Sequence, residues 1–386
     1  MDHETVITTF TDFFTDRGHR RLSGTTLLAG PGDPVLFTTS GMHPLTPYLQ
    51  GDPHPLGRRL VNVQRCLRTT DLDEVGDRTH LTLFEMLGSW SLGDYDHPQS
   101  LRWGYELLRD GYGVPPERLH VTVFGGDDQV GPDTRSLDVW TSLGVPVELT
   151  GEDNWWSNGP TGPCGPDSEI FVWTGSGRPV GTPSTDPRWV EVWNHVDTCF
   201  HRYDDGSLRP LVQRNVDTGM GLERLLMVLQ GKDSVYETDL FSPWGLRGLW
   251  ELDVEPRRVV TDHLRSSTVV LGEGVRPSNT GRGYVLRRLI RRTLTTLWRV
   301  DPSYTLVDLP PSLVSQTLSR LQLRPDGVRD VLLGEERRFR GLLDRGRDRV
   351  HRMRGRGPLD EDDFRFLHDT HGLPRDLVDS LLSELS

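Results

Sequence analysis

The chain has 386 residues, of which 34% are hydrophobic and 26% are charged, and its formal net charge is −12. This composition is typical of a folded globular protein long enough for two domains, and it excludes a disordered chain. The acidic balance argues against a protein that is basic over its whole surface, so any contact with nucleic acid must depend on a local basic stripe.

The start of the chain and its cysteines indicate the compartment. The first residues, MDHETVITTF, lack the basic and apolar regions of a secretory signal, and no apolar run is long enough for a membrane helix. Cys66, Cys164 and Cys199 lie far apart in the sequence, which is typical of reduced thiols and offers no zinc pattern. We therefore expect a cytoplasmic protein without a structural disulfide and without a membrane partner.

The first expected element is an amphipathic helix that ends near Gly18. Its apolar residues recur at helical spacing: Val6, Ile7, Phe10, Phe13 and Phe14. We expect a turn over residues 31–34 and a short strand over residues 35–38. Residues 61–95 then predict an antiparallel hairpin, because apolar residues flank two arginines on the first arm and return after an acidic loop.

Two residues of this hairpin suit a nucleotide. Arg68 ends the first arm, and Phe84 lies on the returning arm. The planar guanidinium of an arginine can donate to a phosphate, and an aromatic side chain on the neighbouring strand can cover a purine. The hairpin is therefore a candidate for binding a nucleotide phosphate and its base.

The middle of the chain predicts scaffold elements and a loop. Helices are expected over residues 101–108 and 137–143, and a strand over residues 120–124. Residues 153–170 combine glycines and prolines with two tryptophans, which indicates either a plain turn or a loop whose backbone approaches a ligand. Residues 191–200 alternate as a strand, so Asn194 and Val196 share one face and would meet the same ligand.

Within residues 215–230, the spacing of Leu222, Leu225, Leu226 and Leu229 predicts a helix that is buried on a face of leucines and that the chain enters through Asp217, Gly219 and Gly221. Asp217 and Arg224 do not belong to that face. A carboxylate beside a pocket can bind a substrate ammonium, and an arginine can bind a terminal phosphate. The local pattern alone leaves two alternatives open, in which Asp217 caps the helix and Arg224 is a solvated side chain.

A domain boundary is expected between residues 241 and 251, where proline and glycine loosen the chain. The region that follows is expected to be helical, with a second arginine-rich helix over residues 335–354. Residues 281–298 place one apolar face opposite a basic stripe made of Arg287, Arg288, Arg291 and Arg292. Such a stripe is either a solvated face or a surface that binds RNA phosphates.

A series of segments resembles, in order, the catalytic core and tRNA-recognition region of alanyl-tRNA synthetases, a class II family. The segments are QRCLR, DLDEVG, FEMLGSWSLGDY, GPTGPCGPDSEI, EVWN, VDTGMGLERLL, RPSNTGRGYVLRRLIRR and HDTHGLPRDL. The resemblance implies an α+β fold, in which a mostly antiparallel class II sheet flanked by helices is followed by an all-helical domain. We expect a catalytic domain over residues 1–245 and a tRNA-recognition domain over residues 246–386. The editing and C-terminal domains of full-length members are expected to be absent.

The resemblance also implies roles for particular residues. Arg68 and Arg224 would be catalytic. The expected ATP-binding residues are Arg68, Phe84, Glu85, Met86, Glu169 and Arg224. The expected amino-acid-binding residues are Trp156, Asn194, Val196, Asp217 and Gly219. The expected tRNA-binding residues are Asn279, Arg282, Arg288, Arg292 and Asp369. Mg²⁺ is expected to accompany ATP because magnesium prefers oxygen ligands, including phosphate.

No metal site made by protein side chains alone is predicted. His368 and His371 have a spacing that could hold a metal, but no further ligands cluster with them in the sequence. The implied activity is ATP-dependent activation of alanine and its transfer to the 3′ end of tRNA by a monomer. The alternative is transfer of alanine, or another small amino acid, to a small-molecule acceptor in secondary metabolism.

Departures from the family pattern keep this alternative open. The hairpin tip at residues 69–79 is shorter than in typical bacterial members, and it lacks a lysine that reaches ATP phosphate in them. Pro160 and Asp167 replace a usual aspartate and cysteine. Asp197, Thr198 and Cys199 are more polar than usual, which leaves room for a substrate other than alanine.

Overall fold

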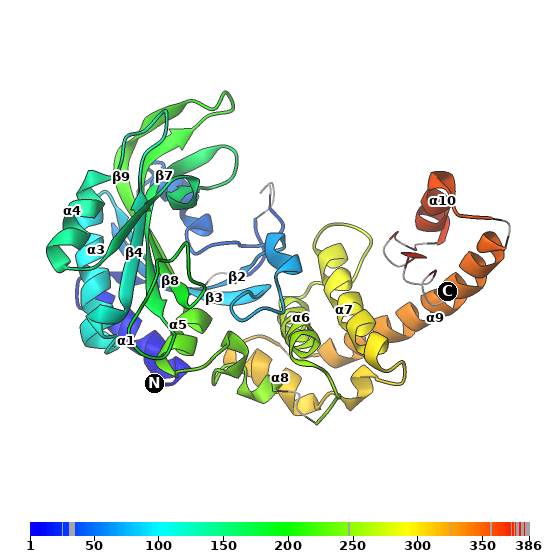
Figure 1. The fold of residues 1–386 in the computed structure, drawn as a ribbon. Coiled ribbons are helices and arrows are strands. Elements are labelled where there is room, and N and C mark those ends of the chain that lie inside the picture. Colours follow the sequence, from blue (N-terminus) through cyan, green and yellow to red (C-terminus); the bar gives the residue numbers. More distant parts are fainter. Residues whose placement is uncertain are drawn as a thin grey trace. The chain divides into compact units, whose positions relative to one another are not determined.

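The computed structural model describes residues 1–24, 26–30, 35–245, 248–324, 326–355, 357–371, 373, 375, 378, 379 and 382, without the side chains of residues 71 and 368–371. The chain divides into two compact units, residues 1–246 and 247–386 (Figure 1). The turn expected over residues 31–34 lies outside the described residues. No helix in the described part of the chain combines the length and apolar character needed to cross a membrane.

A mixed, mostly antiparallel sheet forms the centre of the first unit. Its order is β1-β2-β3-β9-β8-β7-β4-β5, and β6 pairs with β7 off this path. The strands are β1 Arg20–Arg21, β2 Arg59–Leu67, β3 Leu83–Leu92, β4 Leu119–Phe124, β5 Val147–Thr150, β6 Trp155–Ser157, β7 Gly162–Trp173, β8 Trp189–Arg202 and β9 Leu208–Gly221. Among these described strands, β1 with β2 and β4 with β5 pair parallel, and the other pairs are antiparallel. The predicted α+β architecture is confirmed.

Helices of the first unit pack against this sheet (Figure 1). They are α1 His3–Thr15, α2 Thr46–Leu49, α3 His97–Glu106, α4 Thr134–Leu143 and α5 Leu222–Leu229. The predicted first helix is α1: the Asp2 side chain caps it by accepting from the Thr5 backbone N–H at 2.8 Å. Its buried face contains Phe10 and Phe14, and Gly18 follows it with a φ of +84°.

The predicted hairpin is formed by β2 and β3, whose register runs from Arg59 opposite Ser91 to Leu67 opposite Leu83. The prediction of a short strand over residues 35–38 is wrong. Phe37 forms one isolated bridge with Leu28. At the next residue, the Thr38 N–H donates to the Leu27 carbonyl, and its carbonyl accepts from the Leu67 N–H. Because these hydrogen bonds go to two different segments, no ladder can extend.

The interpretation of residues 153–170 as a loop is also wrong, because they contain β6 and most of β7. Gly165 explains how a segment rich in glycine and proline is accommodated in a strand. A Cβ atom at this position would lie 1.9 Å from the carbonyl oxygen of Asp197 on β8. The close approach that glycine permits here is therefore between the backbones of two neighbouring strands.

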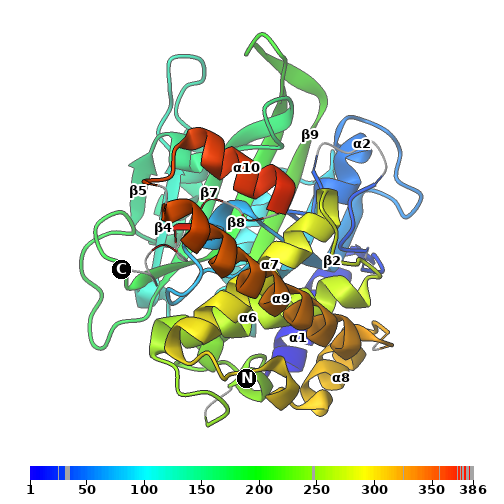
Figure 2. The ribbon, with the colours of Figure 1, turned by 90° about the vertical axis from the view of Figure 1, so that its right-hand side faces the viewer.

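The second unit consists of helices in its described part (Figure 2). They are α6 Val254–Gly272, α7 Gly281–Val300, α8 Pro311–Arg320, α9 Val328–Arg354 and α10 Glu361–His371. The apolar face predicted for α7 is buried, with Leu286, Leu289 and Ile290 at most 1% exposed. This face packs within the unit, where α7 contacts α6 and α9. The second arginine-rich helix is α9.

Candidate active site

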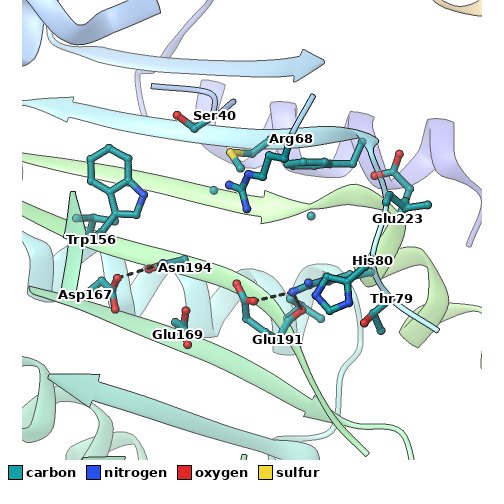
Figure 3. A pocket seen from close by; sticks show the side chains of 18 of the residues that line it. Ser40, Arg68, Thr79, His80, Trp156, Asp167, Glu169, Glu191, Asn194 and Glu223 are labelled. Carbon is teal, nitrogen blue, oxygen red and sulfur yellow. Dashed lines mark hydrogen bonds and ion pairs between the residues drawn. The ribbon is translucent and has the colours of Figure 1, made fainter. Parts of the chain in front are cut away.

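A cavity of about 470 Å³ lies on the central strands of the first unit (Figure 3). Strands β3, β9, β8, β7 and β6, the loop between β2 and β3, and the start of α5 contribute side chains to it. The lining residues that matter below are Arg68, His80, Phe84, Met86, Trp156, Asp167, Glu169, Glu191, Asn194, Val196, Asp217, Gly219, Glu223 and Arg224. The hairpin β2–β3 and the β9–α5 junction, which are distant in sequence, therefore meet at one cavity.

Arg68 and Phe84 lie together at this cavity, as their positions in the hairpin predict. The guanidinium carbon of Arg68 lies 5.1 Å from the centroid of the Phe84 ring. The Arg68 Nε–H donates to the carbonyl oxygen of Thr39 at 3.1 Å. The ring and the carbonyl together fix the plane of the guanidinium and leave its terminal nitrogens for a ligand.

Arg224 and Glu191 form an ion pair in the cavity. The distance from Arg224 Nη1 to Glu191 Oε2 is 2.6 Å, and the two side chains are 27% and 33% exposed. Glu191 was not singled out in the sequence because simple alternation puts it on the face opposite Asn194. A register shift between β7 and β8 intervenes: Ile170 pairs with Trp193, but Phe171 pairs with Glu191. The extra residue, Val192, reverses the alternation and brings Glu191 to the cavity.

Glu169 and Glu191 make one part of the cavity strongly acidic. Burial, together with the charges of Glu191 and Asp167, raises the pKa of Glu169 to about 9. Two carboxylates that repel each other in this way favour a cation between them. Among the described residues, no group of three or more His, Cys, Asp or Glu side chains could hold a metal ion alone.

Two buried aspartates lie toward the other end of the cavity. Asp217 is 7% exposed and accepts a hydrogen bond from Trp90 Nε1 at 2.6 Å. Asp167 is 2% exposed and accepts from Asn154 Nδ2 at 2.7 Å and from Asn194 Nδ2 at 3.2 Å. Burial raises the pKa of each carboxyl to about 7, against the hydrogen bonds that favour the charged form.

His80, in the loop between β2 and β3, also lines the cavity and was missed in the sequence. Its ring nitrogens lie 2.6 Å from Asp77 Oδ2 and 2.9 Å from Glu74 Oε2. The hydrogen bond to Asp77 raises the pKa of His80. The sequence carries little signal that His80 lines a cavity, because a histidine in a polar loop is ordinarily solvated.

Glu85 is placed differently from the other predicted site residues of the first unit. Phe84 and Met86, its neighbours on β3, both line the cavity. Because successive side chains of a strand point to opposite faces, the Glu85 side chain points away from it. The Glu85 backbone N–H donates to the carboxylate of Glu223, at 3.1 and 3.2 Å to its two oxygens. The expectation that the Glu85 side chain binds ATP does not fit this geometry.

The remaining predicted residues of the first unit come together in the cavity. Trp156, Asn194 and Val196 line it, as do Met86 and Gly219. A Cβ atom at position 219 would lie 2.7 Å from Met86 Sδ, so only glycine leaves the Met86 side chain where it is. The cavity thus brings two arginines, a set of acidic groups and an apolar wall within reach of one ligand.

In the second unit, Asn279 precedes α7, and the predicted RNA-facing arginines lie along α7 from Arg282 to Arg292. Arg287 Nη1 donates to Asn279 Oδ1. Arg288 is exposed, whereas Arg282 and Arg292 are half-buried. Arg291, another member of the basic stripe, instead pairs with Glu335 of α9 at 2.8 Å and thus serves the packing of the unit. The side chain of Asp369 lies outside the described residues, as do those of His368 and His371.

Arginines at one part of a cavity and buried carboxylates at another suit a ligand that is a polyanion joined to a cationic group. Together with a mostly antiparallel sheet flanked by helices, this site defines a class II synthetase. The family model described as "tRNA synthetases class II (A)" matches residues 5–386. The chain belongs to this family.

Curated relatives agree with this assignment. The alanine–tRNA ligase of Treponema pallidum is 41% identical over 409 residues, which cover 96% of this chain and 67% of that protein. The alanine–tRNA ligase of Treponema denticola is 44% identical over 328 residues, covering 79% of this chain and 54% of that protein. The cytoplasmic alanine–tRNA ligase of Caenorhabditis elegans is 37% identical, and the alignment covers 98% of this chain and 44% of that protein. The chain thus spans about half to two thirds of their length.

A solved structure, the apo histidyl-tRNA synthetase of S. aureus, overlaps 61% of this chain and 68% of its own. The TM-score is 0.39 at 12% sequence identity.

Proposed function

We propose that the chain activates alanine with ATP and transfers the alanyl group to the 3′ end of tRNA. The observation that carries the proposal is the cavity, which Arg68 and Arg224 line together with the carboxylates of Asp217 and Glu191. In the first step, an alanine carboxylate oxygen attacks the α-phosphorus of ATP and pyrophosphate leaves. In the second step, a hydroxyl of the terminal ribose attacks the carbonyl carbon of alanyl-adenylate and AMP leaves.

Each arginine has a distinct task in the first step. Arg68, held by the carbonyl of Thr39, would bind the α-phosphate and stabilise the negative charge that develops there. Arg224 would exchange part of its contact with Glu191 for the γ-phosphate. Phe84 would cover the adenine ring, with Met86 beside it and Glu169 on the nucleotide side of the cavity. Glu85 is left out of this set because its side chain points to the other face of the sheet.

The cavity fits Mg²⁺ that arrives with ATP. Magnesium is usually held by one or two carboxylates together with substrate phosphates and water. Glu169 and Glu191 provide such a pair, and their mutual repulsion, which raises the pKa of Glu169, would be relieved by a cation. The ion would neutralise phosphate charge when it is bound.

The amino acid would occupy the end of the cavity that contains Asp217. The Asp217 carboxylate would pair with the ammonium group, and Asn194 and Gly219 would border it. Val196 and Trp156 would supply the apolar surface that meets the methyl group. An apolar wall beside a buried carboxylate suits alanine, which carries an ammonium group and a small apolar side chain.

The second unit would bind tRNA. Asn279, Arg282, Arg288 and Arg292 lie at the start and along one stripe of α7, where a basic surface can meet phosphates. Asp369 would complete this set. On this basis residues 1–245 are proposed as the catalytic domain and residues 246–386 as the recognition domain.

The test is pyrophosphate exchange with each amino acid, followed by incubation with and without total tRNA. Exchange that depends on alanine, and formation of alanyl-tRNA, are the expected results. No relative described above carries a name that favours the small-molecule acceptor. Consumption of ATP and alanine that ignores tRNA but responds to a small amine would overturn tRNA as the acceptor.

The setting of the protein is also part of the proposal. Cys66, Cys164 and Cys199 are free and buried, as expected for a protein of a reducing compartment such as the cytoplasm. A monomer is proposed as the working state, and its measurement is the molar mass in solution by light scattering.

A further inference from the structure

A buried tryptophan lies behind the carboxylate that faces the amino-acid end of the cavity. Trp90 on β3 and Asp217 on β9 are direct partners in the antiparallel register. Trp90 is 0% exposed, and its indole Nε1–H donates to Asp217 Oδ1 at 2.6 Å. Asp217 lines the cavity, and Trp90 itself does not. The indole N–H can therefore influence a ligand through Asp217, whereas the apolar part of the ring belongs to a cluster against which Trp156 of the cavity packs.

The indole ring has no room to move. A Cβ atom at Gly88 would lie 2.2 Å from Trp90 Cη2, and one at Gly41 would lie 3.0 Å from Trp90 Cζ2. The ring thus fills the space that two glycines leave open. Trp90 also belongs to a buried apolar cluster with Met42, Leu45, Leu49, Leu60 and Leu92. A donor held this rigidly fixes the direction of the oxygen that accepts from it.

The hydrogen bond divides the two oxygens of Asp217 between two tasks. An ionised carboxylate accepts hydrogen bonds at both oxygens, so contact of Oδ1 with the indole leaves Oδ2 for a ligand. The same hydrogen bond favours the charged form of Asp217 and counteracts the burial that raises its pKa to about 7.

The other groups around Asp217 do not replace this donor. Its partner on β8 is the uncharged Val196. On β7, Asp167 is a second buried carboxyl, held by Asn154 and Asn194. The phenol of Tyr95, whose pKa burial raises, also interacts with the charge of Asp217. Trp90 is the donor recorded for the Asp217 carboxylate within the part of the chain that the structure describes.

We propose that Trp90 is a positioning residue, which holds Asp217 so that its second oxygen meets the ammonium group of the amino-acid substrate. This inference rests on the proposed function, because it assumes that an amino acid occupies the cavity. It adds to that function a residue that touches neither substrate nor nucleotide and yet sets the affinity for the substrate.

The test compares two substitutions that each remove one indole N–H from a buried tryptophan. Trp90→Phe removes the donor to Asp217. Trp140→Phe is the matched control, because Trp140 is also 0% exposed and donates from Nε1 to Ser168 Oγ at 2.8 Å. Ser168 does not line the cavity. Replacing Trp90 by 3-benzothienylalanine serves as a second variant, which keeps the bicyclic shape and lacks only the N–H.

Steady-state pyrophosphate exchange is measured against the concentrations of the amino acid and of ATP. Loss of a hydrogen bond to a charged group predicts that Trp90→Phe raises KM for the amino acid about 10-fold or more. KM for ATP should stay within about twofold of the wild-type value, and Trp140→Phe should leave both constants within the same range.

The pH profile of kcat/KM for the amino acid supplies a readout that a loss of packing alone would not move. Only the ionised Asp217 can pair with the ammonium, so kcat/KM should fall as pH drops through the pKa of this carboxyl. Without the indole donor the charged form is less favoured, so the acid limb of Trp90→Phe should move to higher pH. The benzothienylalanine variant should show the same movement with wild-type thermal stability.

An unchanged KM for the amino acid and an unmoved acid limb in the benzothienylalanine variant would overturn the inference. An equal rise of KM in Trp140→Phe would do so as well. Failure of the proposed function would give a different result, namely no exchange that depends on alanine. The role of Trp90 does not depend on alanine itself, because every α-amino acid carries the same ammonium group. The comparison can be run with whichever amino acid supports exchange by the wild-type protein, whether or not it is alanine.

Discussion

Replacement of Arg224 is the sharpest test of the site. The distance from Arg224 Nη1 to Glu191 Oε2 is 2.6 Å, and both side chains are about one third exposed. An ion pair with this exposure contributes about 0–1 kcal/mol to folding stability. Removal of a preorganised donor from a developing charge costs about 2.7–4 kcal/mol in the transition state, or roughly 10²–10³-fold in rate. A catalytic role and a structural role therefore predict different magnitudes.

Arg224→Ala should lower the rate of pyrophosphate exchange by about 10²-fold or more, with thermal stability close to that of the wild type. The loss includes the repulsion between ATP phosphates and a Glu191 carboxylate that no longer has its partner. The exchange rate of Arg224→Lys should lie between those of the wild type and Arg224→Ala, because lysine keeps the charge and loses the planar set of donors.

The assay is exchange at saturating alanine over a range of ATP concentrations. Arg188→Ala is the matched control, since Arg188 forms an ion pair of 2.6 Å with Asp186 in the same unit and does not line the cavity. Its exchange rate should stay within about twofold of the wild type. A rate for Arg224→Ala within about threefold of the wild type would refute the assignment of Arg224 to the phosphates.

Other substitutions test the remaining parts of the site. Arg68→Ala should also lower exchange by about 10²-fold or more, and a nearly wild-type rate would remove Arg68 from the mechanism. Asp217→Asn should raise KM for alanine more than it lowers kcat. It should also abolish the acid limb expected near pH 7, because burial raises the pKa of this carboxyl to about 7 and only its ionised form pairs with an ammonium. Arg288→Ala combined with Arg292→Ala should spare exchange and weaken tRNA charging, with a shallower salt dependence; unchanged charging would count against this surface.

The elements that the sequence predicts well are those whose burial repeats along the chain. Leu289 and Ile290 of α7 and Phe10 of α1 are buried at helical spacing, so the period alone identifies their helices. Asn194 and Val196 share a face because alternation is regular between them. Local periodicity shows which side of an element is buried, and the placement of these residues depends on little else.

The elements that the sequence misses depend on other parts of the chain. Glu191 reaches the cavity because the register shift beside it breaks the alternation, and a register shift is a property of two strands. The only signal in the sequence was its place at the start of the EVWN segment. Gly165 lies in a strand because the backbone of β8 passes close by, which no local pattern reveals. Phe37 fails to start a strand because the N–H and the carbonyl of its neighbour Thr38 bond to separate segments.

In the hairpin of β2 and β3, the length of the tip and the positions of Arg68 and Phe84 are independent of each other. Arg68 follows the last pair of the ladder, Leu67 opposite Leu83, and its N–H donates to the Thr82 carbonyl at 3.0 Å. Phe84 is itself a member of the ladder, opposite Cys66. The positions of Arg68 and Phe84 are thus set by the ladder, whatever the length of residues 69–79. Lineages can shorten or lengthen this tip, and so alter the loop side chains that it brings to the cavity, such as Thr70 and Thr79, while Arg68 and Phe84 keep their places relative to each other.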